Sequence, residues 1–393
     1  MPDRGTSAGR PLGVLADDLS GAVECAAVLG AGTPVLLSPE PLLDHGVPAG
    51  PVVVDADARL RSGAAAAGAL EGAARALAGH TLFVKIDSLL RGPVAAAVSV
   101  AARRGTVVLC PALPAHGRSV RGGVLHLDGV PLHRTTAWHL EPVPAPDRVA
   151  RLLPPGLTGA VVGRDRQRAG GLHQLLADPP APVLVCDAEG PDDLARLGAA
   201  VRAHPGTVAV GSSGLLAAVA GATPARGHRT TPPGRRLVVV GSASAEAAEQ
   251  TRRLLARHHV RLLPAPLHPD DGLDTAAFSA SLTAALAGGD VVVTLPLPDR
   301  AARVEPARLA AQLGAAVVRA VEEQPVDLVL IGGATARGVL AAAGVERLEV
   351  VAQIHPGAVA SLDPTGRLLV TRPGSHGSPD SLTQVLDWLE GPA

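Results

Sequence analysis

Two adjacent carboxylates, Asp17 and Asp18, follow the apolar run Leu12–Ala16, and Ser20 comes two residues later. A pair of carboxylates at the end of a strand can hold a metal ion or accept the proton of a hydroxyl group. The same residues could instead simply begin a helix, with Asp18 or Ser20 as its cap. Taken alone, this motif supports both interpretations equally.

Lys85 is the only lysine in a chain whose other basic residues are all arginine. A single lysine in so arginine-rich a sequence indicates a position where a compact ammonium group is needed. Polar side chains crowd the end of the same apolar run, Leu82–Ile86, and could grip a carboxylate and hydroxyls: Asp87, Ser88 and Arg91. An alternative role for Lys85 is Schiff-base chemistry.

Two further arginines also follow predicted strands. Arg118 comes directly after Gly117, a few residues beyond Val107–Cys110, and Arg59 lies shortly after Val52–Val54. A guanidinium on such a turn is suited to bidentate binding of a carboxylate or phosphate. Each could equally be an ordinary surface arginine.

Glycine and hydroxyl residues follow three strands in the second half of the chain. Glycine allows close backbone approach, and Ser and Thr hydroxyls with helix-start amides suit phosphate oxygens. Three such turns together predict a nucleotide site, whose candidate residues are Ser242, Ser244, Gly332, Gly333, Ala334, Thr335, Gly374 and Gly377.

Short β-branched runs alternate with alanine-rich stretches long enough for helices, which predicts α/β domains with doubly wound parallel sheets. The stretch 222–236 is polar and proline-containing, and reads as a linker between domains spanning residues 11–221 and 237–390. In such sheets, ligands bind beyond the carboxyl ends of the strands. Every cluster above lies at such a position.

The formal net charge is −1, so nothing favours binding to nucleic acid or to a membrane surface. No apolar run has the length of a signal peptide or a membrane span, and the three cysteines form no metal-type pair. We therefore expect a cytoplasmic protein. The histidines, including His258, lack zinc-type spacing, and metal ligands remain unassigned. No P-loop motif is present.

In this order, the clusters resemble those of the four-carbon acid sugar kinases over nearly the whole chain. Residues 17–22 resemble the motif D-D-x-T-G-A, residues 85–92 resemble K-x-D-S-T-L-R-G, and residues 111–118 resemble P-A-x-P-x-x-G-R. Residues 241–244 with Gln250, 332–335 and 355–357 look like the family's nucleotide-domain motifs.

The resemblance implies an N-terminal domain that binds a sugar acid and a C-terminal domain that binds ATP. It implies ATP-dependent phosphorylation of a hydroxyl of threonate, erythronate or 3-oxo-tetronate, with Mg²⁺ as the usual cation. Asp17, Asp18, Lys85 and Asp87 would then be catalytic candidates. The other strand-end residues of the first half would bind the substrate. A homodimer is left open.

The chain departs from the family pattern at three informative positions. Leu89 replaces the usual Thr, Ala334 replaces an acidic residue, and Arg372 replaces a lysine. These differences keep one alternative open, namely a protein of the same fold that binds nucleotide and sugar acid with impaired catalysis.

Overall fold

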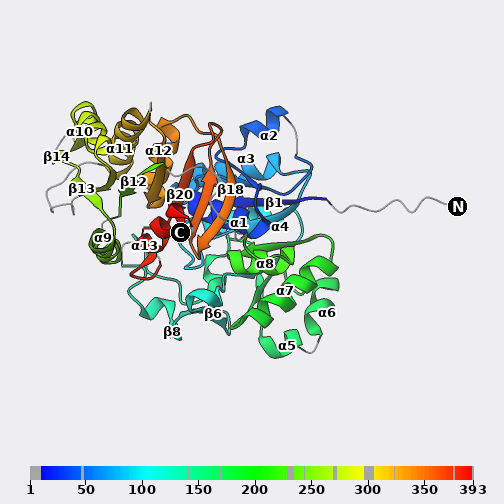
Figure 1. Ribbon diagram of the computed structural model, residues 1–393. Helices are drawn as coiled ribbons and strands as arrows, with labels where there is room; N and C mark the ends of the chain where they lie inside the picture. The colour runs from blue at the N-terminus through cyan, green and yellow to red at the C-terminus, as the bar shows by residue number, and fades with distance from the viewer. Residues whose placement is uncertain are drawn as a thin grey trace. The chain divides into compact units, whose positions relative to one another are not determined.

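The chain divides into two compact units, one formed by Met1–Leu29 with Ser38–Thr223 and the other by Gly30–Leu37 with Pro224–Ala393. The computed structural model describes residues 10–45, 48–139, 141–168, 170–225, 227, 234–242, 244–268, 272–295, 305–322, 324–374 and 377–391. Much of the predicted linker, residues 226 and 228–233, lies outside the described residues. Figure 1 shows both units.

The first unit contains a seven-stranded parallel sheet, as the buried β-branched runs predict. Its order is β3 (Val52–Asp55), β1 (Leu12–Ala16), β4 (Thr81–Lys85), β11 (Thr207–Gly211), β5 (Thr106–Cys110), β10 (Val183–Cys186) and β9 (Gly159–Val162). A small antiparallel sheet follows β5 and consists of β6 (Arg118–Arg121), β7 (Val124–Leu127) and β8 (Val130–Pro131).

Helices follow most of the strands of this unit. They are α1 (Leu19–Leu29), α2 (Glu40–His45), α3 (Gly63–Ala76), α4 (Val94–Ala102), α5 (Arg164–Arg168), α6 (Gly171–Ala177), α7 (Pro191–Ala203) and α8 (Ser213–Ala220). Helix α1 begins three residues after β1, so the carboxylates that follow β1 lie at the start of a helix.

The second unit has a mixed sheet. Its parallel part is β13 (Val260–Pro264), β16 (Asp290–Thr294), β12 (Arg235–Val240), β17 (Val326–Ile331) and β20 (Leu368–Arg372). The antiparallel part is β19 (Ala358–Leu362), β18 (Arg347–His355) and β2 (Pro34–Leu36), with a separate hairpin of β14 (Leu267–His268) and β15 (Gly272–Leu273).

Two features of this unit differ from the sequence-based prediction. The sequence predicts a parallel sheet here, but the apolar run Val350–Ile354 belongs to β18, which is antiparallel to β19. A short connection explains this, because Pro356 and Gly357, with Gly357 at φ +87°, can only turn the chain back on itself. Strand β2, from the first 40 residues, pairs with β18 and therefore belongs to the second unit.

Five helices flank the sheet of the second unit: α9 (Ala245–Arg257), α10 (Thr275–Ala287), α11 (Pro306–Val321), α12 (Gly333–Ala342) and α13 (Ser381–Glu390). Helices α10, α11 and α12 lie side by side, as do α9 and α13 (Figure 1). Gly314 and Gly338 allow α11 and α12 to approach closely, since a Cβ atom on Gly338 would lie 2.8 Å from the carbonyl carbon of Ala310.

The cores consist of small aliphatic side chains, and every residue of β3, β10 and β17 is buried. Phe83 and Phe278 are among the largest side chains that are fully enclosed or nearly so. No helix among the described residues has the length and apolar character that a membrane crossing requires.

Candidate active site

The strand register brings the predicted residues of the first unit to one edge of its sheet. Ala16 at the end of β1 is level with Asp55 on β3 and with Lys85 on β4, and Lys85 is level with Gly211 on β11. The side chains that follow these strand ends therefore share the carboxyl edge, where parallel α/β sheets bind ligands.

Arg59 joins the two carboxylates that follow β1. Its Nε lies 2.5 Å from Oδ2 of Asp17, and its Nη2 donates to Oδ1 of Asp17 at 2.7 Å and to Oδ1 of Asp18 at 2.9 Å. Gly92, at φ +81°, leaves room for this arrangement, because a Cβ atom there would lie 2.7 Å from Cδ of Arg59. Both oxygens of Asp17 are therefore occupied by one guanidinium.

Burial dominates the electrostatics of this pair. Asp17 is 2% exposed, and desolvation raises the pKa of its carboxyl group although the charge of Arg59 opposes the shift. Burial also disfavours the charged guanidinium of Arg59. The surrounding carboxylates, Asp17 first and then Asp18, outweigh that effect and raise its pKa. Asp17 thus serves to hold Arg59 in place.

Asp18 is more open than Asp17. Its side chain is 24% exposed, and its Oδ1 also accepts the backbone N–H of Gly21 at 3.0 Å, which anchors it to the first turn of α1. Its Oδ2 has no hydrogen bond to another described residue. Ser20 is half-buried in the same turn. Of the two carboxylates, Asp18 is the one with an oxygen available to a ligand.

Lys85 is buried beneath the start of α1. A Cβ atom on Gly21 would lie 3.0 Å from Nζ of Lys85 and 2.7 Å from Oδ1 of Asp18, so only glycine leaves room for both groups. Burial disfavours the ammonium ion, but the charge of Glu24 and then those of Asp18 and Asp17 raise the pKa of Lys85. Sequence reasoning missed Glu24. The available signal was its position three residues after Gly21, on the same face of α1.

Asp87 lies between two arginines. Its Oδ2 accepts Nε of Arg91 at 2.6 Å and the backbone N–H of Arg91 at 3.2 Å, and its Oδ1 is 4.0 Å from Nη1 of Arg59. Burial opposes ionisation of Asp87, but Arg59 and then Arg91 lower its pKa well below the usual range. Asp87 is therefore a stable anion that orders both arginines, which makes it a poor proton acceptor.

Replacing Asp87 with asparagine is expected to lower the free energy of unfolding by about 2–3 kcal/mol at neutral pH, because Arg91 loses its ion pair and Arg59 loses one of its three neighbouring carboxylates. The folded-state pKa lies below the unfolded value of about 3.9, so the contribution is present above about pH 4 and is lost as the pH falls further. Urea unfolding of both proteins at several pH values measures this difference. Asp165→Asn, on an exposed carboxylate, is the control. If the difference in unfolding free energy between the two proteins does not shrink below about pH 4, the lowered pKa of Asp87 is wrong.

Ser88 and Arg118 meet at the next strand end. Nη1 of Arg118 donates to Oγ of Ser88, and Gly117, at φ +67°, makes the turn that directs Arg118. Burial lowers the pKa of Arg118, with Asp87 acting against the shift. His116 precedes this turn, and burial followed by the charge of Arg118 lowers its pKa. Sequence reasoning did not select His116, which is a neutral imidazole beside the predicted substrate residues.

In the second unit, the carboxyl ends of three neighbouring strands bring the glycine turns together. Val240 on β12 is level with Ile331 on β17, which is level with Arg372 on β20. A Cβ atom on Gly374 would lie 2.6 Å from Oγ of Ser242 and 3.7 Å from Cα of Gly332. The three turns therefore pack against one another, and glycine is required where they meet.

Two of these turns open helices. Ser244 caps α9, since its Oγ accepts the N–H of Ala247 at 3.1 Å, and Gly332, at φ +107°, precedes α12. Gly333, Ala334 and Thr335 form the first turn of α12, and Ala334 brings no functional group. Such helix starts present backbone N–H groups to an anion. Gly374 and Gly377 are described, whereas Ala243, Ser375 and His376 lie outside the described residues.

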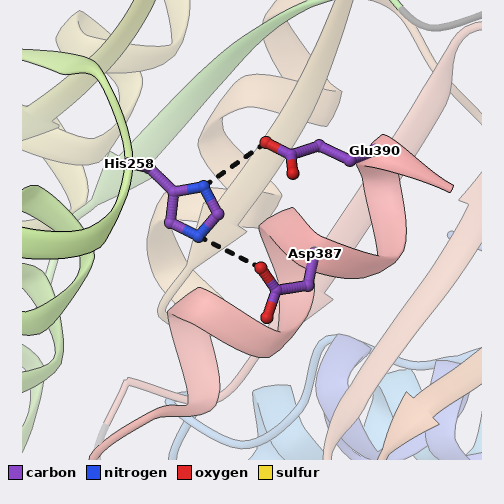
Figure 2. Close-up of side chains that lie close together, drawn as sticks. All are labelled: His258, Asp387 and Glu390. Carbon is purple, nitrogen blue, oxygen red and sulfur yellow. Dashed lines mark ion pairs between the residues drawn. The ribbon is translucent and has the colours of Figure 1, made fainter. Parts of the chain in front are cut away.

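His258, at the end of α9, forms a separate group with two carboxylates on α13 (Figure 2). Its Nε2 is 3.3 Å from Oδ1 of Asp387 and its Nδ1 is 3.4 Å from Oε1 of Glu390. Across the described part of the chain, this is the one group of three that could share a metal ion. Opposite ring nitrogens face the two carboxylates, and Glu390 also pairs with Arg236 at 2.7 Å. We interpret the group as a contact that fastens α9 to α13.

Comparisons with known proteins agree with this division into two units. A family model described as the sugar-binding N-terminal domain matches residues 12–219, and one described as the nucleotide-binding C-terminal domain matches residues 237–382. The chain is similar to a D-threonate kinase of Cupriavidus necator, with 34% identity covering 94% of this chain and 95% of the relative.

A 3-oxo-tetronate kinase of Burkholderia multivorans is 30% identical, covering 98% of this chain and 99% of the relative. The solved structure of the Haemophilus influenzae protein HI1011 superposes with a TM-score of 0.72 at 19% identity, covering 96% of this chain and all of that one. At that identity the structural likeness supports the fold alone.

Proposed function

Because the chain belongs to the four-carbon acid sugar kinase family, we propose that it transfers the γ-phosphoryl group of ATP to a hydroxyl of a four-carbon sugar acid. The observation that carries this proposal is the cluster at the first sheet's carboxyl edge. There, Asp18 pairs with Arg59, lies near Lys85 and has an oxygen available, and Arg91 and Arg118 are bonded to Asp87 and Ser88 at the neighbouring strand end. The names of the relatives support threonate and 3-oxo-tetronate as the first substrates to test.

In this proposal, the cations of the first unit bind the acid. Arg118 is directed by Ser88 and Gly117, and Arg59 and Arg91 are ordered by Asp17 and Asp87. A planar guanidinium suits bidentate binding of the substrate carboxylate, whereas the Lys85 ammonium suits a hydroxyl or phosphoryl oxygen. Asp18 accepts the proton of the attacking hydroxyl.

The second unit supplies the features expected of an ATP site. Its three glycine turns bring backbone and hydroxyl groups together without bulky side chains, and two of them open helices whose N-termini favour phosphate. Phosphoryl transfer depends on positioning and on charge stabilisation, and Mg²⁺ bound to the phosphates supplies much of the latter. Ser242 and Ser244, which are both half-buried, are the hydroxyl residues that would meet the phosphates.

The test is ADP release with Mg²⁺ and ATP in the presence of D-threonate, D-erythronate, their L-isomers or 3-oxo-tetronate. We expect turnover with one of these acids and little without any acid. ADP or ATP binding without turnover across the whole panel would instead support the alternative of a binding protein. The residues Leu89, Ala334 and Arg372, which depart from the family pattern, motivate that alternative.

We further expect the protein to act in the cytoplasm, because its three cysteines are buried and free. The proposed partner is the small sugar acid alone. Gel filtration coupled to light scattering would decide between a monomer and a homodimer.

A further inference from the structure

Arg372 ends β20 directly before the third glycine turn, and its side chain is only 1% exposed. A buried guanidinium is costly unless its N–H groups are bonded. Nη2 of Arg372 donates to Oε1 of Gln250 at 2.6 Å, inside the unit. Arg372 is therefore held within the protein at the edge of the proposed nucleotide site.

Gln250 extends this contact to the turn itself. It lies on α9, is 1% exposed, and donates from Nε2 to the backbone oxygen of Ser378 at 3.0 Å and of Gly377 at 3.4 Å. A Cβ atom on Gly377 would lie 3.3 Å from Nη1 of Arg372. Gln250 thus uses its amide oxygen for the arginine and its amide nitrogen for the turn.

The two turns joined in this way are neighbours. Helix α9, which carries Gln250, begins at the turn that contains Ser242 and Ser244, and Gly374 of the third turn packs against Ser242. The hydrogen bonds of Gln250 therefore tie Arg372 at the end of β20 and residues 377–378 to the helix that begins at the first turn. Burial also lowers the pKa of Arg372 to about 10, so the group remains cationic near neutral pH beside turns that suit an anion.

We infer that Arg372 and Gln250 are positioning residues for the nucleotide, which hold Gly377 and Ser378 against α9 beside the proposed phosphate site. This inference rests on the proposed ATP site. It assigns neither residue a contact with ATP.

The variant Gln250→Glu keeps the size of the side chain but removes its amide donor, so it tests the positioning role apart from packing. The new carboxylate can still accept from Arg372, now as an ion pair, but it cannot donate to the carbonyls of Gly377 and Ser378. The ion pair with Arg372 offsets part of the loss of these two hydrogen bonds, so we expect the variant to fold with a lowered thermal midpoint. The Kd for ADP, measured by calorimetry, should rise about tenfold or more because the turn is misplaced. Gln384→Glu, an exposed glutamine on α13, is the matched control and should bind ADP as the unaltered protein does.

Two substitutions of Arg372 test the same positioning role: Arg372→Met removes the charge, and Arg372→Lys keeps it. Arg372→Met should weaken ADP binding and raise the KM for ATP, and it should leave the KM for the sugar acid unchanged. Arg372→Lys should bind ADP more tightly than Arg372→Met does. If Gln250→Glu binds ADP normally, the positioning role is wrong although the kinase assignment stands. If the unaltered protein binds no ADP, the proposed function fails, and this inference fails with it.

Discussion

Replacing Lys85 with methionine is expected to lower kcat/KM for the sugar acid by about 10²–10³-fold, the size typical of losing one charged group that stabilises a transition state. Methionine is similar in length and fits the buried site beneath Gly21, so the loss should come from the missing charge. Steady-state kinetics with the sugar acid varied measures the effect. The Kd for ADP should stay unchanged, because the nucleotide turns belong to the other unit.

Lys85→Arg is the informative companion variant. A guanidinium keeps the charge, but it is wider than an ammonium, and Gly21 and Asp18 leave little space around Nζ. Arginine should therefore rescue activity poorly. Near-normal turnover of Lys85→Met would remove this lysine from the mechanism. A borohydride-trapped adduct on Lys85 would replace the kinase chemistry with a Schiff base, which the surrounding anions disfavour by raising its pKa.

Asp18→Asn is expected to lower kcat by about 10²–10⁴-fold, because the amide cannot accept the hydroxyl proton. Asparagine keeps an oxygen for the backbone N–H of Gly21, so the start of α1 and the KM for the sugar acid should change little. Rapid-quench measurement of a single turnover isolates the chemical step. Asp165→Asn, in the first turn of α5, removes an exposed carboxylate and should leave kcat as it is.

A comparison of Asp18→Asn with Asp17→Asn shows which of the two adjacent carboxylates accepts the hydroxyl proton. Both oxygens of Asp17 are engaged by Arg59, so this variant should loosen Arg59 and raise the KM for the acid more than it lowers kcat. If Asp17→Asn abolishes the chemical step while Asp18→Asn retains it, the roles assigned here are reversed.

Much of the architecture could be predicted because it depends on local patterns. Short buried runs such as Leu12–Ala16 favour strands between helices, and polar clusters that follow such strands lie at the carboxyl edge of a parallel sheet. The α/β fold class and the resemblance to the four-carbon acid sugar kinases are confirmed. The site residues remain predictions that the variants above test.

Other features could not be read from the chain. Nothing local distinguishes Asp17 from Asp18, because the difference arises from Arg59, more than 40 residues away. The same holds for Glu24, whose charge acts on Lys85 across the space between a helix and a strand. The transfer of β2 to the second unit depends on pairing with β18, some 310 residues later.

The sequence by itself thus determined which residue types stand at the strand ends and that one half carries charged clusters and the other glycine turns. It could do so because strand and turn propensities act over a few neighbouring residues. Only the tertiary structure decided which carboxylate keeps an oxygen available to a ligand, which arginines are ordered by ion pairs and which glycine turns pack together. Those properties depend on burial and on contacts between distant segments, such as Arg372 with Gln250, and these exist only once the sheet has assembled.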